Sequence, residues 1–378
     1  MTTMDAREAL ASNVLGARVG VLKTGQLGRM LGLAGRALGL ELTFLDPNAD
    51  SPARAVGELI VSDYESASAL AQLADARVVT FEFENVPVGA VKALEVRGTV
   101  FPGSRALEVA QDRLHEKTCF RSLGIATPEF EAVDSWPELA AALERVGLPA
   151  VLKTRRFGYD GKGQAVLRSV ADAEAAFQRL GGAPLILEGF VPFERELSII
   201  AARSRSGEIV SYPLVQNHHE GGILRKTVAP APSVSEELQR VARQHIEKLL
   251  LYLDYVGVLA LELFQVDGGL VANEIAPRVH NTGHWTIEGA RTSQFENHLR
   301  AILGLPLGAT DAVSPCAMLN VIGMAPDARA VLAVPDAHLH WYGKEPRPGR
   351  KVGHVTVLAP DAATLAERVS VLERILSV

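Results

Sequence analysis

The sequence VLALELFQVDGGLVANEIAPRVHNTGHW, residues 258–285, contains two strand-like runs on either side of Asp267-Gly268-Gly269. Apolar and β-branched residues that flank a short glycine-bearing turn are typical of a β-hairpin. Across this turn we expect Glu262 to face Glu274 at a separation of about 5 Å. Like charges directly opposite each other destabilise a sheet, so the pair requires a cation or a shared proton.

The expected register of this hairpin pairs Val266 with Leu270 and Phe264 with Ala272. Side chains alternate between the two faces of a strand, so the face opposite the glutamates should be apolar. The leucines of the first strand have this alternation and are expected in a core: Leu259, Leu261 and Leu263.

The glutamate pair is a candidate Mg²⁺ site, with Glu262 and Glu274 as ligands and Asn273 beside them. Mg²⁺ is commonly held by one or two carboxylates and completes its shell with phosphate oxygens and water. The alternative is a solvated face that carries two unrelated glutamates. Residues 277–285 favour the metal site, because they gather a cation, imidazoles and amides on an irregular loop beside rigid strands.

Composition limits the class of protein. A chain of 378 residues is expected to form two or three domains, and its 48% hydrophobic and 22% charged residues are ordinary for a soluble protein. A net charge of -6 argues against a nucleic-acid partner. Cys119 and Cys316 are too few for a disulfide framework and suit a reducing compartment. With no signal peptide and no long apolar run, we expect a cytoplasmic protein without membrane contact.

Residues 18–104 alternate strand and helix patterns, as in a doubly wound parallel sheet. The loop KTGQLG, residues 23–28, opens the first helix and is a candidate phosphate site, although its incomplete G-x-G-x-x-G makes a dinucleotide fingerprint weak. A plain strand-to-helix turn is the alternative. Glu82 follows the strand that should face the ligand crevice, and one helix is expected from Ser104 to about Leu123.

A second α/β unit begins near Gly124, where Lys153 closes an apolar strand before a glycine-rich segment. We interpret residues 155–164 as a mobile lid over a polyphosphate, with a glycine-rich hairpin turn as the alternative. The lid is favoured because two arginines and Lys162 repel each other unless an anion neutralises them. Adjacent His218 and His219 point to opposite faces of a strand, which argues against a zinc site.

The C-terminal residues 311–378 predict a small β-rich domain with a terminal helix. Within it, residues 340–354 are rich in cations and include Lys344 and Arg350 around a Pro-Gly turn. This segment suits a phosphate monoester, and an exposed basic loop is the alternative.

Six motifs together resemble one enzyme family. They are GQLGRM, DRLHEK, GYDGKGQ, QNHHEGGILR, NEIAPRVHNTGHWT and HWYGKEPRPGRKVGH. The set is similar to the ATP-grasp superfamily and, within it, to the 5-(carboxyamino)imidazole ribonucleotide synthases, over nearly the whole chain from Gly20 to about Thr356. The resemblance implies an α/β ATP-grasp fold, with a Rossmann-like parallel-sheet domain at 1–115, an ATP-grasp domain at 116–310 and a β-rich domain at 311–378.

The resemblance also implies a reaction. ATP and bicarbonate would form carboxyphosphate, and 5-aminoimidazole ribonucleotide would be carboxylated to N5-carboxyaminoimidazole ribonucleotide in purine biosynthesis. The implied cofactors are ATP and Mg²⁺, as one ion or two, for which Mn²⁺ can substitute. The implied assembly is a homodimer.

Roles for single residues follow from the same resemblance. The ATP phosphates are assigned to Arg113, Lys153, Gly158, Tyr159, Asp160, Gly161, Lys162, Gly163 and Gln164. The remainder of the nucleotide is assigned to Glu188, Gly189, Phe190 and Val191 at the adenine, Glu196 at the ribose, and His219. Mg²⁺ and the γ-phosphate are assigned to Glu262, Asn273 and Glu274. Bicarbonate is assigned to the catalytic residues Arg278, His280 and Asn281. The ribonucleotide is assigned to Gln26, Glu82, Tyr159, Asp160, Lys344 and Arg350.

Three other classes of protein are alternatives to this family. A related ligase with a different acceptor would share the ATP half, but the basic segment at 340–354 argues against it. A regulatory nucleotide-binding protein should have lost metal and phosphate groups, yet Lys153 and Glu274 are present. A dehydrogenase is disfavoured by the incomplete glycine fingerprint. Lys23-Thr24 departs from the glycines that the resembled family places before GQLG.

Overall fold

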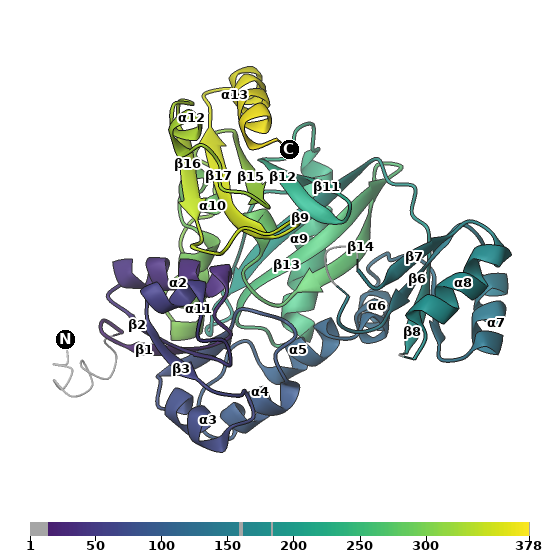
Figure 1. Cartoon of the computed structure of the whole chain (residues 1–378), viewed down its shortest axis with the longest axis horizontal. Helices are drawn as coiled ribbons and strands as arrows, with labels where there is room; N and C mark the ends of the chain where they lie inside the picture. The colour runs from purple at the N-terminus through teal and green to yellow at the C-terminus, as the bar shows by residue number, and fades with distance from the viewer. Residues whose placement is uncertain (1–13, 159–161, 183, 378) are drawn as a thin grey trace.

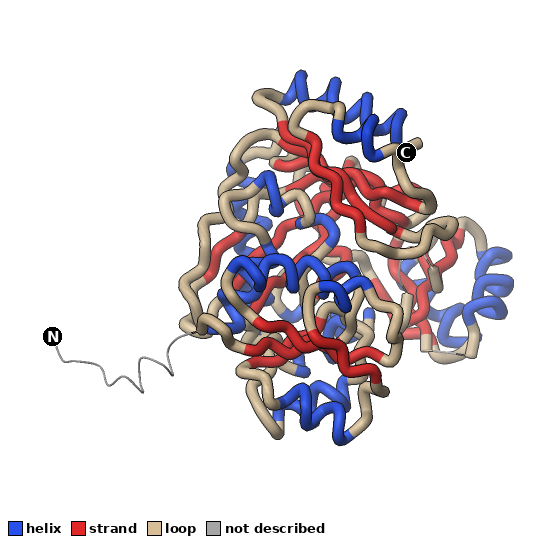
Figure 2. Tube along the Cα trace, turned by 60° about the vertical axis from the view of Figure 1, so that its left-hand side comes forward, coloured by secondary structure: helices blue, strands red, loops and turns tan. Residues whose placement is uncertain are grey.

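The computed structural model describes residues 14–158, 162–182 and 184–377, which form three β-sheets with helices packed around them (Figures 1 and 2). Figure 1 shows the N-terminal sheet and the C-terminal strands on the same side of the molecule. A small sheet formed by residues 130–189 projects on the other side. None of the helices in these residues is both long and apolar enough to span a bilayer.

The N-terminal sheet is parallel throughout, with strand order β3-β2-β1-β4. Its strands are β1 (Arg18–Leu22), β2 (Glu41–Asp46), β3 (Glu58–Val61) and β4 (Val78–Phe81). The connecting helices are α2 (Gln26–Ala37), α3 (Ala67–Ala74) and α4 (Val88–Glu95). This order confirms the predicted doubly wound arrangement, in which ligands bind beyond the carboxyl ends of the strands.

The predicted single helix from Ser104 to about Leu123 is wrong. Two helices occupy this segment, α5 (Ser104–Ala110) and α6 (Arg113–Ser122). Asp112 separates them because its backbone is extended, and its carboxylate caps α6 by accepting a hydrogen bond from the Leu114 amide at 3.0 Å. The cap places Arg113 in the first turn of α6, facing the large sheet.

The small sheet is antiparallel, with strand order β5-β8-β6-β7. Its elements are β5 (Phe130–Val133), α7 (Trp136–Val146), β6 (Ala150–Thr154), β7 (Gln164–Leu167), α8 (Val170–Leu180) and β8 (Leu185–Gly189). The two helices cover one face and share a core with the sheet. The glycine-rich segment connects β6 to β7.

The large sheet has nine strands in the order β14-β13-β9-β11-β12-β15-β17-β16, with β10 paired to β9. The strands are β9 (Arg195–Arg203), β10 (Ile209–Ser211), β11 (Val215–Glu220), β12 (Ile223–Ala229), β13 (Gly257–Val266), β14 (Gly269–Ala276), β15 (Cys316–Ile322), β16 (Ala337–Trp341) and β17 (Lys351–Leu358). Around it lie α9 (Glu236–Tyr252), α10 (Thr286–Gly289), α11 (Gln294–Leu303), α12 (Ala328–Leu332) and α13 (Ala362–Leu376). The C-terminal strands therefore extend the central sheet through the β12–β15 pairing.

The two faces of β13 have different partners. Leu259, Leu261 and Leu263 are buried in a core with α9, as predicted. Val258 and Ala260 face the other way, into a core that α11 and the N-terminal sheet share. Glu262 continues this second face, so the carboxylate lies next to the junction between the large sheet and the N-terminal region.

The predicted hairpin register is wrong at the turn and right at the glutamates. Val266 pairs with Gly269, so the turn is Asp267-Gly268, whose φ values of 48° and 75° suit the two-residue turn that matches strand twist. The register then shifts between Glu262 and Leu263. This β-bulge restores the pairing of Glu262 with Glu274.

Candidate active site

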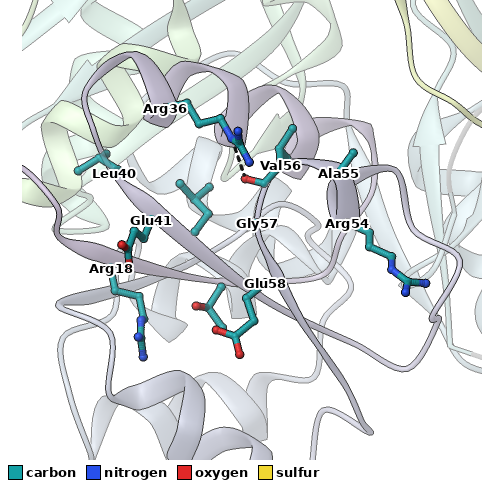
Figure 3. A pocket seen from close by; sticks show the side chains of 11 residues that line it. Arg18, Arg36, Leu40, Glu41, Arg54, Ala55, Val56, Gly57 and Glu58 are labelled. Atoms are coloured by element: carbon teal, nitrogen blue, oxygen red, sulfur yellow. Dashed lines mark hydrogen bonds between the residues drawn. The ribbon is translucent and has the colours of Figure 1, made fainter.

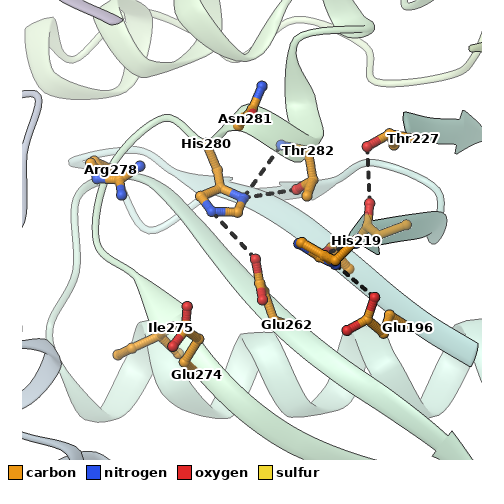
Figure 4. Close-up of polar contacts among 12 residues, drawn as sticks. Glu196, His219, Thr227, Glu262, Glu274, Ile275, Arg278, His280, Asn281 and Thr282 are labelled. Atoms are coloured by element: carbon orange, nitrogen blue, oxygen red, sulfur yellow. Dashed lines mark hydrogen bonds and ion pairs between the residues drawn. The ribbon is translucent and has the colours of Figure 1, made fainter. Parts of the chain in front are cut away.

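The two glutamates form the centre of a polar cluster on β13 and β14 (Figure 4). The Glu262 side chain is 16% exposed and that of Glu274 is 40% exposed. Burial, together with the charge of Glu274, raises the pKa of Glu262 to about 7. A cation between these carboxylates would remove the repulsion.

A cation and an imidazole flank the pair. Arg113 Nη1 lies 3.1 Å from Glu274 Oε2, and His280 Nε2 lies 3.5 Å from Glu262 Oε1. Burial, then the positive charge of Arg278, lowers the pKa of His280 well below its ordinary value, so the imidazole is neutral. His280 Nδ1 lies 2.9 Å from Thr282 Oγ1 and accepts from the Thr282 amide at 3.5 Å; with Nδ1 as the acceptor in both contacts, the ring hydrogen is on Nε2, directed toward Glu262.

The described residues contain no group of three or more His, Cys, Asp or Glu side chains arranged to hold a metal. A divalent cation at the Glu262–Glu274 pair would therefore take its other oxygen ligands from a bound phosphate and water. The pair fits this demand because the two glutamates are cross-strand partners on one face of the hairpin.

Glu196 and His219 lie on the same face of the sheet, next to the glutamate pair (Figure 4). His219 Nδ1 and Glu196 Oε2 are 2.6 Å apart. Burial alone would lower the pKa of His219, but the hydrogen bond to Glu196 and the charge of Glu262 outweigh it and raise the pKa. Glu196 and His219, the two residues predicted to contact the nucleotide here, therefore lie at one location.

Lys153 is bound to a buried carboxylate. Its Nζ donates to Glu188 Oε2 at 2.9 Å, and Lys117 Nζ lies 3.4 Å from the same oxygen. Burial alone would raise the pKa of Glu188, but Lys117 and Lys153 hold it at about 2. The Glu188 side chain therefore neutralises two lysines. This leaves the backbone from Glu188 to Val191 as the part of the connector that could recognise a base.

The prediction that the lid cations need an external anion is wrong for Arg155, whose partner is a carboxylate, and stays a prediction for Arg156, whose partner is a neutral amide. Arg155 donates to Asp112 at 3.0 and 2.6 Å, and Arg156 donates to the Gln111 side chain at 2.5 Å. These bonds fix the start of the segment against the N-terminus of α6. The predicted contacts at 159–161 lie outside the described residues, and the predicted mobility of 155–164 stays a prediction.

Arg278 is oriented by the N-terminal region. Its guanidinium pairs with Glu84 and donates to the Val279 carbonyl at 3.1 Å. Burial would raise the pKa of Glu84, but the charge of Arg278 outweighs it and lowers the pKa. The pair joins the loop after β4 to the loop after β14, although 194 residues separate them.

Asn281 is held by a residue that sequence analysis missed. Its amide exchanges two hydrogen bonds, of 3.1 and 2.8 Å, with Asn320 of β15. Asn320 is fully buried and also donates to the Leu224 carbonyl at 2.8 Å. A buried asparagine in an otherwise apolar strand is a recognisable signal, because such an amide requires partners.

Two of the residues assigned to the ribonucleotide, Gln26 and Lys344, come together at a second location. Lys344 Nζ donates to Gln26 Oε1 at 2.9 Å, which joins segments 318 residues apart. Glu82 is buried, and burial raises its pKa to about 7. Arg350 Nη1 donates to the Glu345 carbonyl at 3.0 Å.

The phosphate site predicted at the N-terminus of α2 is contradicted. The carboxylate of Glu82 accepts hydrogen bonds from the amides of Gly25 and Gly28, so it occupies the position expected for an anion. Lys23 has a φ of 77°, a conformation that favours glycine, and its Nζ lies 3.3 Å from Asp46 Oδ2.

A cavity of about 430 Å³ lies elsewhere, at the amino ends of the N-terminal strands (Figure 3). Arg18, Arg36, Arg54, Glu41 and Glu58 are among its lining residues. None of the predicted site residues that the structure describes lines it.

Sequence and structure comparisons give one consistent result. Residues 17–111 match the ribonucleotide synthetase preATP-grasp domain, residues 118–295 the ATP-grasp domain, and residues 316–368 the phosphoribosylaminoimidazole carboxylase C-terminal domain. The chain is 54% identical to N5-carboxyaminoimidazole ribonucleotide synthase of Pseudomonas aeruginosa, over 95% of this chain and 99% of that protein.

Two solved structures extend the likeness. N5-carboxyaminoimidazole ribonucleotide synthetase of Thermus thermophilus superposes with a TM-score of 0.92 at 55% identity, covering 95% of this chain and 99% of that one. The Aspergillus clavatus synthase, solved with ADP and 5-aminoimidazole ribonucleotide, superposes with a TM-score of 0.89 at 34% identity, covering 96% and 99%.

Proposed function

The chain belongs to the family of N5-carboxyaminoimidazole ribonucleotide synthases, a branch of the ATP-grasp enzymes, and we propose that it catalyses their reaction. ATP and bicarbonate carboxylate the exocyclic amine of 5-aminoimidazole ribonucleotide in purine biosynthesis, with release of ADP and phosphate. The observation that carries the proposal is the facing pair Glu262 and Glu274, flanked by Arg113 and His280.

The proposed ATP-binding part of the active site lies between the small sheet and the face of the large sheet that carries the glutamates. Lys153 and Arg113 face the phosphates, together with Gly158, Lys162, Gly163 and Gln164. The backbone from Glu188 to Val191 holds the adenine, while Glu196 and His219 hold the ribose. The hydrogen bond between Glu196 and His219 supports this role because it fixes both side chains on one face.

Glu262 and Glu274 would hold Mg²⁺, and Asn273 would lie beside the γ-phosphate. When bound, the cation neutralises charge on the phosphate oxygens during transfer. Arg113 holds the Glu274 carboxylate in place at 3.1 Å. The raised pKa of Glu262 supports the assignment, because a like-charged, partly buried pair accommodates a cation readily.

Bicarbonate attacks the γ-phosphorus, the bond to ADP breaks, and carboxyphosphate forms. Arg278 and His280 stabilise the carbonate oxygens, Arg278 by its charge and His280 through the hydrogen on Nε2. Asn281 lines the same loop, with its amide oriented by Asn320. The amine nitrogen then bonds to the carboxyl carbon, phosphate leaves with its oxygen, and the amine loses a proton.

The acceptor lies between the N-terminal sheet and the C-terminal strands. Gln26 and Glu82 contact the ribonucleotide from one side, and Lys344 and Arg350 bind its phosphate from the other. The Lys344–Gln26 hydrogen bond supports a shared site. We further propose domains at 1–115, 116–310 and 311–378, and a homodimer.

The proposal is tested by measuring ADP formation with Mg²⁺, ATP and bicarbonate, with and without 5-aminoimidazole ribonucleotide. We expect strong stimulation by the ribonucleotide and loss of one free amine for each ADP formed. ADP formation that ignores the ribonucleotide would overturn the acceptor, and none under either condition would overturn the enzyme assignment.

A further inference from the structure

β14 is an edge strand, because β13 is its single strand neighbour in the large sheet. An edge strand leaves one row of backbone amides and carbonyls without strand partners. In β14 the helix α6 and the segment that follows it bind several of these groups. Ala126 accepts from the Ala272 amide at 2.7 Å, and Thr127 donates to the Ala272 carbonyl at 3.1 Å.

Two side chains of α6 contact the bulge and the residue that follows Glu274. Lys117 Nζ donates to the Asn273 carbonyl at 2.6 Å, and Glu116 Oε1 accepts from the Ile275 amide at 2.6 Å. These contacts lie on either side of Glu274. Lys117 and Glu116 are both buried, so the hydrogen bonds form away from water, where they are stronger.

The bulge decides which residue faces Glu262. From the turn, Val266 pairs with Gly269, and an unbroken ladder would continue to a pairing of Glu262 with Asn273. Glu274 would then lie on the opposite face of the hairpin, because side chains alternate. The extra residue Asn273 instead places Glu274 opposite Glu262.

Lys117 shares the Glu188 carboxylate with Lys153 and is the more distant of the two cations, at 3.4 Å against 2.9 Å. A buried ammonium is costly unless it is paired and hydrogen-bonded. Of the contacts that Lys117 makes, the one to the Asn273 carbonyl at the bulge is shorter than the one to Glu188, at 2.6 Å. The geometry therefore points to a role at the bulge.

We propose that Lys117 and Glu116 are positioning residues that hold the Asn273 bulge and thereby present Glu274 and Asn273 to the metal and phosphate. The inference rests on the proposed function for its catalytic consequence. Its structural part, the stability of the bulge, does not depend on that function.

The test uses the full-length variants Lys117→Met and Glu116→Ala, with Thr127→Val as the matched control. Thr127→Val also removes a side-chain hydrogen bond to β14, but one to Ala272 instead of the bulge. Hydrogen exchange of residues 270–277 is measured in the protein without ATP or metal. Turnover is measured with Mg²⁺, ATP, bicarbonate and 5-aminoimidazole ribonucleotide, at varied Mg²⁺.

In Lys117→Met we expect exchange in 270–277 to accelerate and kcat to fall about ten- to a hundredfold, the range for loss of a hydrogen bond from a charged donor. The Mg²⁺ concentration for half-maximal rate should rise, while KM for the ribonucleotide stays within about twofold. Glu116→Ala should behave alike and serves if Lys117→Met fails to fold. Thr127→Val should keep kcat within about twofold.

Unchanged hydrogen exchange of residues 270–277 in both α6 variants would overturn the inference. An effect confined to KM for ATP would also overturn it, because Lys117 would then act through Glu188 and not through the bulge. An equal loss of kcat in Thr127→Val would also overturn it, because any weakening of the strand would then suffice. Failure of the proposed function looks different: the wild-type protein would lack ribonucleotide-dependent turnover, while hydrogen exchange would still report on the bulge.

Discussion

Replacing Glu274 by glutamine removes one charge from the facing pair with almost no change in shape. Two effects on stability oppose each other. The substitution breaks the ion pair with Arg113 at 3.1 Å and relieves the repulsion of Glu262. Because the Glu274 side chain is 40% exposed, each effect is about 1 kcal/mol or less, and the free energy of unfolding should change by less than about 1 kcal/mol.

The effect on catalysis should be far larger. A group that stabilises charge in a transition state contributes several kcal/mol, so we expect kcat of Glu274→Gln to fall by about a thousandfold. Urea unfolding and ribonucleotide-dependent ADP formation measure the two quantities on one preparation. The matched control is Glu237→Gln on α9, which breaks an exposed pair with Arg240 and should leave kcat unchanged. Near-normal turnover of Glu274→Gln in Mg²⁺ would refute the metal assignment.

Three further predictions concern other parts of the molecule. Lys344→Ala should raise KM for the ribonucleotide far more than KM for ATP in steady-state kinetics, and equal effects would remove Lys344 from the acceptor site. Gly25→Ala should also raise KM for the ribonucleotide, because its Cβ would lie 2.7 Å from Glu82 Oε1; an unchanged KM would contradict this. His298 accepts from the Val258 amide at 3.1 Å, and burial lowers its pKa from 6.5 to about 4. The free energy of unfolding should therefore fall as the pH falls from 6.5 toward 4, because the unfolded chain binds the proton more readily. The loss that this histidine causes between pH 7.5 and 5 is about 2 kcal/mol. Urea unfolding of His298→Asn should show a pH dependence smaller by that amount, and an identical pH dependence would count against it.

Local patterns predicted the large elements well. The alternating leucines of β13 identified its buried face, and the Asp-Gly turn identified the hairpin. The pairing of Glu262 with Glu274 was predicted from an incorrect register, because two errors cancelled. The true turn is one residue shorter than expected, and the bulge at Asn273 compensates.

The bulge could not be predicted from the hairpin alone. Its backbone partners, Glu116 and Lys117, come from α6, more than 150 residues earlier in the chain. The motif that contains them, DRLHEK, resembles that of a known family, but local sequence does not show that these side chains bind an edge strand.

Predictions of anion binding from local charge were wrong where a group from a distant part of the sequence already binds the site. The charge of Arg155 predicted an external anion, yet the Asp112 carboxylate already neutralises it. The N-terminus of α2 was predicted to bind phosphate, yet the Glu82 carboxylate accepts hydrogen bonds from its amides. In both cases the competing group arrives through tertiary contacts, which spacing along one segment cannot reveal.

The most direct test of the central claim is the transfer of oxygen from ¹⁸O-labelled bicarbonate to phosphate, followed by ³¹P NMR. Attack of bicarbonate on the γ-phosphorus predicts phosphate that carries one ¹⁸O, formed together with N5-carboxyaminoimidazole ribonucleotide, and a loss of both products in Glu274→Gln. Unlabelled phosphate formed alongside the carboxylated ribonucleotide would contradict carboxyphosphate chemistry at the glutamate pair.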